Sequence, residues 1–186
     1  MKRQRVNNDG YSLVELIIVI AIIMVLGTVS FLSLNYIKTA KAKEASVTLD
    51  NQVSNLLNRA RNQACKYDNG DGTGESVHKS DRFIILVYKN ADGSYYVKRG
   101  YTGASGDIYV DAENGKDGKG VSLTSYVDIK YNDGSGSVLI DNVGQKIIYD
   151  ASGRCVYGDG DFEFYGKNSS LLSKVTINKN GSHNVN

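Results

Sequence analysis

The first third of the chain contains two patterns of apolar residues, and both predict helix. Residues 16–37 include no charged side chain, and as an α-helix they would be about 33 Å long, close to the thickness of a membrane's hydrocarbon core. No proline interrupts this stretch or the one after it. In residues 38–66 apolar side chains recur mainly at gaps of three and four, at Leu49, Val53, Leu56, Leu57, Ala60 and Ala64. The pattern predicts one helix from about Tyr11 to Lys66, apolar all round in residues 11–37 and amphipathic in residues 38–66.

After residue 67 the pattern changes to short strands separated by turn residues. The 20 glycines suit tight turns, and the 13 tyrosines suit half-buried strands. Gly, Asn and Asp fill the breaks. The sequence therefore predicts an α+β fold, in which a long N-terminal helix packs on an antiparallel β-sheet head of residues 67–186. The expected strands are Arg82–Lys89, Tyr95–Tyr101, Asp107–Asp111, Val121–Tyr131, Ser137–Ile140, Lys146–Asp150, Cys155–Tyr157, Phe162–Tyr165 and Leu171–Lys179.

The charge is concentrated at the N-terminus. Lys2, Arg3 and Arg5, less Asp9, account for the whole net charge of +2. The rest of the chain is neutral overall and lacks the broad basic field that non-specific nucleic-acid binding needs. Nucleic acid is therefore not an expected partner, although the overall charge does not exclude a local basic patch on the head.

No motif in the chain predicts catalysis. The sequence has no nucleophile elbow, no HExxH and no phosphate-binding loop, and its histidines lie in polar loop or tail contexts. Neither cysteine belongs to a CxxC pair, so a zinc site is not expected. We expect no catalytic residue and no metal site, and we predict that the protein is not an enzyme.

The main functional motif lies between the basic N-terminus and the apolar stretch. The segment from Gly10 through Tyr11 and Glu15 to Val19 reads GYSLVELIIV and resembles the class III signal of type IV pilins and pseudopilins. A secretory signal peptide would have a shorter apolar core, followed by a cleavage site and a break. The resemblance implies that residues 1–10 are a leader, which prepilin peptidase removes after Gly10 before methylating the new amine of Tyr11. The family most often has Phe where this chain has Tyr11.

Glu15 is the one carboxylate at the edge of the apolar stretch. A lone charge there is costly unless it finds a partner. The resemblance implies that the partner is the N-terminal amine of a neighbouring subunit, which would make Glu15 an assembly residue. The alternative is that Glu15 only reaches the membrane interface.

Two stretches of the head carry a further resemblance. Ile147–Arg154 and Leu171–Gly181 resemble the hairpins of H-type minor pseudopilins and FimT-like minor pilins. That subfamily often has a proline in the first turn, where this chain has Ala151 and Ser152.

The resemblance implies a structural subunit of a type IV pilus, a type II secretion system or a related filament. The expected location is a single-pass cytoplasmic-membrane precursor with an extracytoplasmic head, then the pilus or pseudopilus. Its expected partners are prepilin peptidase, other pilin subunits and the inner membrane. Two alternatives stay open: a DNA-uptake pilin that binds nucleic acid, and a single-span membrane protein with an adhesive β head, which would not be cleaved.

The same location affects the cysteines and the acidic loops. An extracytoplasmic head permits oxidation, so Cys65 at the helix end and Cys155 on the covering sheet are predicted to form a disulfide; two buried free thiols are the alternative. Some pseudopilins bind calcium in acidic loops, but the loops here lack the spacing of a preformed calcium cage, so we expect solvated turns and no cofactor. The carboxylates concerned are Asp68, Asp71 and Glu75, or Asp111, Glu113 and Asp117.

Overall fold

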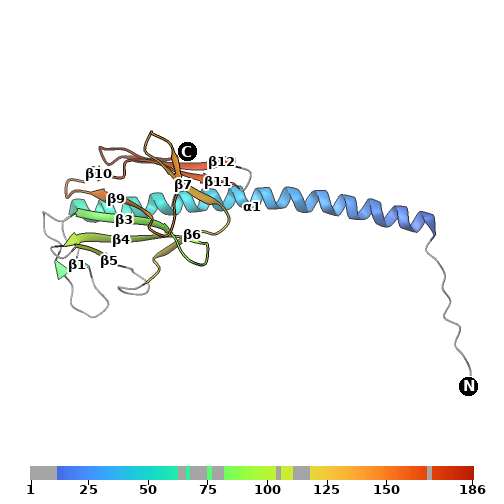
Figure 1. Ribbon diagram of the computed structural model, residues 1–186, viewed down its shortest axis with the longest axis horizontal. Coiled ribbons are helices and arrows are strands. Elements are labelled where there is room, and N and C mark those ends of the chain that lie inside the picture. Colours follow the sequence, from blue (N-terminus) through green and yellow to red (C-terminus); the bar gives the residue numbers. More distant parts are fainter. Residues whose placement is uncertain are drawn as a thin grey trace, which may run out of the picture. The chain divides into compact units, whose positions relative to one another are not determined.

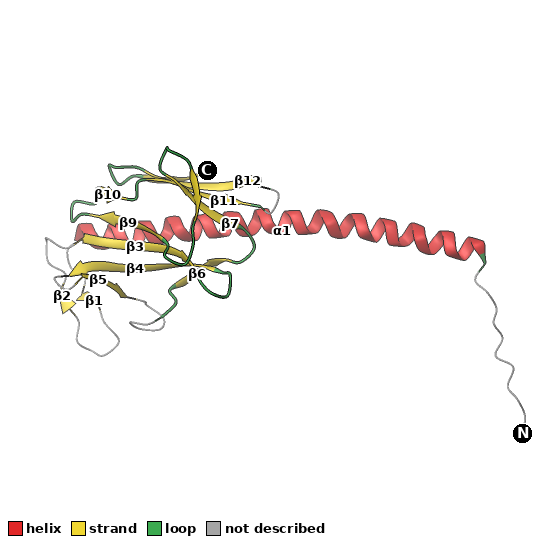
Figure 2. Ribbon diagram, viewed as in Figure 1, coloured by secondary structure: helices red, strands yellow, loops and turns green. Residues whose placement is uncertain are grey.

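The computed structural model describes residues 12–62, 66–67, 75–76, 82–103, 106–110, 118–166 and 169–186. The chain divides into two units, residues 1–37 and 38–186. The described part of the first unit is almost entirely helical, whereas the second unit combines the rest of that helix with all the strands (Figures 1 and 2). The predicted α+β fold class is confirmed.

Helix α1 runs from Leu13 to Asn62, slightly shorter than predicted at both ends. It ends before Lys66, because Lys66–Tyr67 form strand β1 and pair with β2 (Glu75–Ser76). The helix predicted through Lys66 is therefore wrong at Lys66 itself. Strand β2 was not among the predicted strands.

One of the two main sheets holds six antiparallel strands, and we call it the first sheet. Its order is β10-β9-β3-β4-β5, and β6 also pairs with β4. Strands β3 and β10 have the predicted bounds, β4, β5 and β9 agree within two residues, and β6 is only the first part of a longer predicted strand. The strands are β3 (Arg82–Lys89), β4 (Tyr95–Gly103), β5 (Gly106–Val110), β6 (Val121–Thr124), β9 (Gln145–Tyr149) and β10 (Cys155–Tyr157).

The second sheet holds five antiparallel strands in the order β13-β12-β11-β7-β8. Strand β13 was not predicted. It pairs with β12 at the C-terminus, where the main-chain N and O atoms of Asn186 each bond to Lys174 at 2.8 Å. The strands are β7 (Asp128–Asn132), β8 (Ser137–Leu139), β11 (Gly160–Tyr165), β12 (Leu171–Ile177) and β13 (His183–Val185).

The head therefore has two main sheets where a single sheet was expected. The difference arises in residues 121–131, which were predicted as one strand. Thr124 Oγ1 accepts a hydrogen bond from the Tyr126 main-chain N–H at 3.1 Å, and residues 125–127 form a bend. Because β6 pairs with β4 and β7 pairs with β11, this bend carries the chain from the first sheet to the second.

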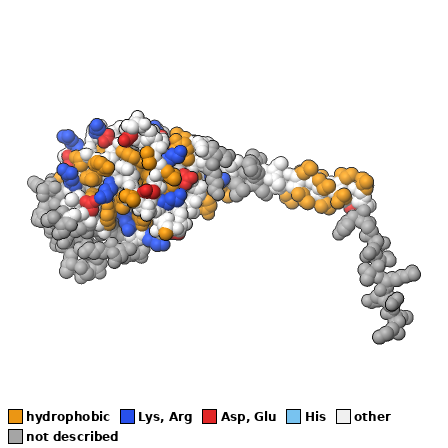
Figure 3. All heavy atoms as spheres, in the orientation of Figure 1, with side chains coloured by type: hydrophobic (Ala, Val, Ile, Leu, Met, Phe, Trp, Pro, Cys, Tyr) orange, Lys and Arg blue, Asp and Glu red, His pale blue; other side chains and the backbone are white. Residues whose placement is uncertain are grey.

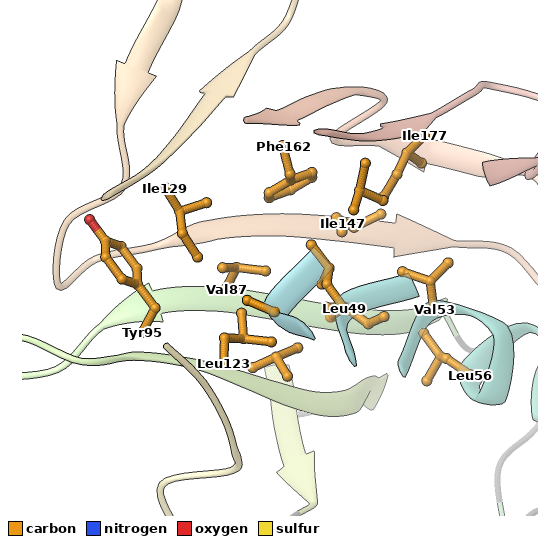
Figure 4. Packing of buried hydrophobic residues seen from close by; sticks show 14 of the residues in the cluster. Leu49, Val53, Leu56, Val87, Tyr95, Leu123, Ile129, Ile147, Phe162 and Ile177 are labelled. Carbon is orange, nitrogen blue, oxygen red and sulfur yellow. The ribbon is translucent and has the colours of Figure 1, made fainter. Parts of the chain in front are cut away.

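A single apolar core joins α1 to both sheets (Figure 4). The predicted helix face is buried at Leu49, Val53 and Leu56, each with no exposed surface. These side chains meet others from both sheets, including Val87, Tyr95, Ile129, Ile147, Phe162 and Ile177. The amphipathic half of the helix is thus a structural part of the head.

The turns of the β9–β10 and β12–β13 hairpins lie against each other. Gly181 has a φ of +84°, and a Cβ at this position would run into the carbonyl oxygen of Gly153. The Cys155 main-chain N–H also donates to the Lys179 carbonyl at 3.1 Å. The two hairpin stretches singled out in the sequence are therefore neighbours in the fold.

Candidate functional site

The start of α1 is a complete capping box formed by Ser12 and Glu15. The Ser12 main-chain N–H donates to Glu15 Oε2 at 2.9 Å, and the Glu15 N–H donates to Ser12 Oγ at 3.2 Å. The Leu16 N–H bonds to the Ser12 carbonyl at 3.2 Å, which makes Ser12 the N-cap residue. This reciprocal arrangement satisfies two main-chain donors that a helix otherwise leaves unpaired.

Only one of the two oxygen atoms of the Glu15 carboxylate is used by the helix cap. Its Oε2 atom is used by the capping box, whereas Oε1 has no hydrogen-bond partner among the described residues, and the side chain is exposed. A negative charge in the first turn is also favoured by the helix dipole. The geometry leaves one carboxylate oxygen available to a donor from outside this helix.

The helix surface that follows Glu15 is apolar on every side. Large side chains from Leu13 to Leu26 are 44–74% exposed, at consecutive positions that cover all faces of the helix. Figure 3 shows these apolar side chains grouped on the first unit, while charged side chains are spread over the second. Such a surface needs lipid or other helices around it.

Not all predicted site residues fall within the described chain. Gly10 and Tyr11, the predicted processing residues, lie outside the described residues, so the processing site remains a prediction. Glu15 lies in the first turn of α1, as expected. Of the carboxylates named for calcium, five lie outside the described residues, and Glu75 belongs to the short strand β2.

The predicted disulfide also remains a prediction, because Cys65 lies outside the described residues. Cys155 is buried and forms no disulfide with any residue that the structure describes. Its Sγ donates to the Tyr157 carbonyl at 3.2 Å. Burial raises the pKa of the Cys155 thiol to about 11, which makes the free thiol unreactive at neutral pH.

One carboxylate in the second sheet is held ionised by three donors. Glu163 accepts hydrogen bonds from Ser137 Oγ at 2.7 Å, Tyr165 OH at 2.9 Å and Asn132 Nδ2 at 3.3 Å. Burial opposes the charge, but the hydrogen bonds outweigh it and hold the pKa of Glu163 below its ordinary value. This network ties together β7, β8 and β11.

Sequence reasoning missed the two polar features of α1. The capping box has a readable signal, since Ser12 and Glu15 show the S-x-x-E spacing just before an apolar run. The second feature is a pair of serines with partners in the second sheet, in which Ser46 contacts Ser173 and Ser54 contacts His183. The two serines are eight residues apart on one face of the helix, but their partners lie more than a hundred residues away.

Two features are absent from the described part of the chain. Within it, no group of three or more His, Cys, Asp and Glu side chains could hold a metal ion. Among the same residues, no helix has the combined length and apolar character required to cross a membrane.

Comparison with known proteins gives one match, at the N-terminus. A family model of the prokaryotic N-terminal methylation motif matches residues 5–31, which include Gly10, Tyr11 and Glu15. No curated protein and no solved structure matches the chain. The matched segment covers the capping box and the exposed apolar part of α1.

Proposed function

We propose that this chain, whose methylation motif supports membership of the type IV pilin and pseudopilin family, is a structural subunit of a type IV pilus, a type II secretion pseudopilus or a related filament. The motif supports a precursor that prepilin peptidase processes. In our proposal the cut falls between Gly10 and Tyr11, and the new amine of Tyr11 is methylated. Proteins of this family are structural, and we assign the chain no catalytic reaction.

The observation that carries the proposal is the joint presence of the motif and an apolar helix surface exposed on all sides. An isolated soluble protein does not keep such a surface in water. In a membrane precursor, lipid would cover residues 13–37, and in a filament the same helices would pack against each other. The motif and the surface occupy the same residues, which supports one function for both.

Glu15 gives the proposal a specific contact. Once the leader is removed, each subunit carries a positive amine at Tyr11. In our proposal, Oε1 of Glu15, which has no hydrogen-bond partner among the described residues, accepts a hydrogen bond from such an amine on a neighbouring subunit, while Oε2 keeps the helix capped. A charge-assisted pair of this kind would set the register between adjacent helices in the apolar filament core.

The head would form the outer shell of the filament. Its core closes on residues 42–57 of α1, so the head and the end of the assembly helix are one folded unit. The two adjacent hairpins agree with the resemblance to H-type minor pseudopilins and FimT-like minor pilins, and we propose this subclass.

Mass spectrometry of the mature N-terminus tests the proposal. We expect a chain that begins at methylated Tyr11, and we expect Gly10→Val to leave the precursor uncut. Asn8→Val is the matched control, because it places the same valine side chain in the leader two residues away and should be processed normally. A mature N-terminus downstream of the apolar stretch would contradict the pilin assignment.

A further inference from the structure

Several strands and one loop of the second unit come together at one end of the head. Tyr165, the last residue of β11, lies opposite both Asp128, the first residue of β7, and Leu171, the first residue of β12. The loop between β8 and β9 joins this end, because its Asp141 carbonyl accepts from the Lys89 main-chain N–H at 2.8 Å, and Lys89 Nζ is 3.4 Å from Asp128 Oδ1. We call these strand ends, with the β8–β9 loop and the bend before β7, the base of the head.

The base of the head lies beside the first turns of α1 in the second unit. Ser46 of α1 contacts Ser173, two residues after the start of β12. The pKa of Lys41 is raised, mainly by its hydrogen bond and ion pair with Glu44 and in small part by the hydroxyl of Tyr126, which belongs to the bend before β7. This stretch of the helix and the base are therefore at the same end of the head.

Large apolar side chains are exposed at the base. Tyr126 is 51% exposed, Val143 76% and Leu171 50%. They come from the bend before β7, the β8–β9 loop and the first position of β12, so three separate parts of the sequence present apolar groups at one end. A tyrosine, with an apolar ring and a polar hydroxyl, suits the boundary between water and an apolar phase.

The base also has cations without an acidic partner. Lys41 is paired with Glu44, whereas Lys38 and Lys43, on the same turns of α1, form no ion pair within the described chain. Asp141, the carboxylate of the β8–β9 loop, is engaged by two main-chain N–H groups of its own loop. The exposed apolar groups are therefore accompanied by an excess of positive charge.

We propose that the base of the head binds the surface of a bilayer that contains anionic lipids, at the stage when the chain is a membrane precursor. The proposal rests on the proposed function, in which the uncharged residues 16–37 lie in lipid and end immediately before Lys38. Along α1, Lys43 is about 9 Å beyond Ile37, and each headgroup layer of a bilayer is about 5–8 Å thick.

This spacing brings both parts of the base to the right depth. The ammonium groups of Lys38 and Lys43 reach the lipid phosphates, and Tyr126, Val143 and Leu171 face the boundary of the hydrocarbon. Basic and apolar groups together are the combination that binds the surface of anionic membranes. Entry of the subunit into a filament would then require the base to leave the lipid.

A tryptophan reporter in proteoliposomes tests the proposal. The chain has no tryptophan, so Tyr126→Trp places a single fluorophore at the base, and Val143→Trp provides a second one. The full-length precursor is inserted into phosphatidylcholine vesicles with or without phosphatidylglycerol, each containing a lipid with a spin-labelled headgroup. We expect stronger quenching of both reporters when phosphatidylglycerol is present, and a loss of that difference at high salt.

Tyr157→Trp is the matched control for the position of the reporter. Tyr157 is 56% exposed, close to the value for Tyr126, and lies on β10 opposite Ile148, in the half of β9 remote from the β8–β9 loop. A reporter at this position should be quenched weakly and equally in both kinds of vesicle.

Removal of the two unpaired lysines tests the electrostatic part. A lysine beside an anionic surface strengthens binding about fivefold, so Lys38→Gln combined with Lys43→Gln should weaken docking roughly thirtyfold and reduce quenching to its level in pure phosphatidylcholine. Arg154→Gln combined with Lys179→Gln removes the same charge from exposed positions in the two hairpin turns at the other end of the head. This control should leave the quenching unchanged.

The outcomes separate this proposal from the proposed function. If the precursor inserts but the reporters at the base are quenched equally in both kinds of vesicle, or the lysine variant is quenched like its parent, lipid binding by the base is overturned and the filament function is unaffected. Shielding of the base that depends on the protein-to-lipid ratio and not on phosphatidylglycerol would identify a second copy as its partner, and would also overturn the proposal. A precursor that alkaline washing removes from the vesicles would instead refute the membrane stage itself, and this proposal with it.

Discussion

We expect Glu15→Ala to lower incorporation of the processed subunit into filaments, while cleavage after Gly10 is kept. The substitution removes two interactions of one carboxylate. It removes the acceptor for the Ser12 N–H, which lies 2.9 Å from Oε2, and it removes the charge that would meet a neighbour's amine. The loss of the helix cap and the loss of the charge differ in size, and further variants at Glu15 and Ser12 remove them separately.

The capping loss is the smaller one. Side-chain caps at helix starts contribute about 1 kcal/mol, which is about a fivefold change in the population of an ordered first turn. An ion pair at 4 Å contributes about 4 kcal/mol at an effective dielectric constant of 20. Glu15→Gln keeps an oxygen that can accept from the Ser12 N–H but has no charge, so it should be almost as defective as Glu15→Ala. Ser12→Ala keeps the charge and should be only mildly defective.

The assay is the ratio of processed subunit in sheared filaments to that in membranes, with the mature N-terminus checked by mass spectrometry. Ser12→Thr is the control for Ser12→Ala, because threonine also caps helices. If Glu15→Gln assembles like the wild type while Glu15→Ala and Ser12→Ala fall equally, Glu15 acts only as a helix cap. That result would refute the pairing with a neighbouring amine and leave the processing assignment intact.

Four further predictions concern the head. Residues 36–186 should fold alone as a soluble β-rich domain, and aggregation on expression would show that the boundary is misplaced. In that fragment Leu49→Ala should lower the free energy of unfolding by about 2–5 kcal/mol in urea titrations, because Leu49 is fully buried. Glu163→Gln should cost about 1–3 kcal/mol at pH 7; since the folded pKa is lowered, the wild type's advantage should disappear as the pH falls through that pKa, and a constant difference would argue against it. Finally, unfolded, unreduced protein should resist thiol labelling if Cys155 is joined to Cys65, and full labelling would exclude the bridge.

Local patterns predicted the elements of this fold well. The apolar face of α1 was predicted because helix periodicity reports directly on burial, and Leu49, Val53 and Leu56 are indeed in the core. Strand β3 was predicted because turn residues bound an apolar run. The helix end was predicted too late because Lys66 belongs to strand β1 and pairs with Ser76 of β2. Nothing in the helix sequence identifies Ser76 as the partner of Lys66.

Long-range pairing could not be predicted in the same way. Strand β9 pairs with β3, although five described strands, β4 to β8, lie between them in the sequence. The bend at residues 125–127, where Thr124 Oγ1 accepts from the Tyr126 N–H, decides whether residues 121–131 belong to one sheet or to two. Ser54 and His183 are 129 residues apart in the sequence, so nothing near either residue indicates the other.

The C-terminal position of β12 and β13 determines when the head can fold during synthesis. Helix α1 is synthesised before the strands of both main sheets, whereas Val175 and Ile177, which complete the core around it, are synthesised after β3 to β11. The core therefore cannot close until β12 has been made, by which time the apolar N-terminal segment has long been available for insertion. A premature stop before residue 171 would remove Val175 and Ile177 and leave the core incomplete, so β12 serves as a completeness check on each subunit.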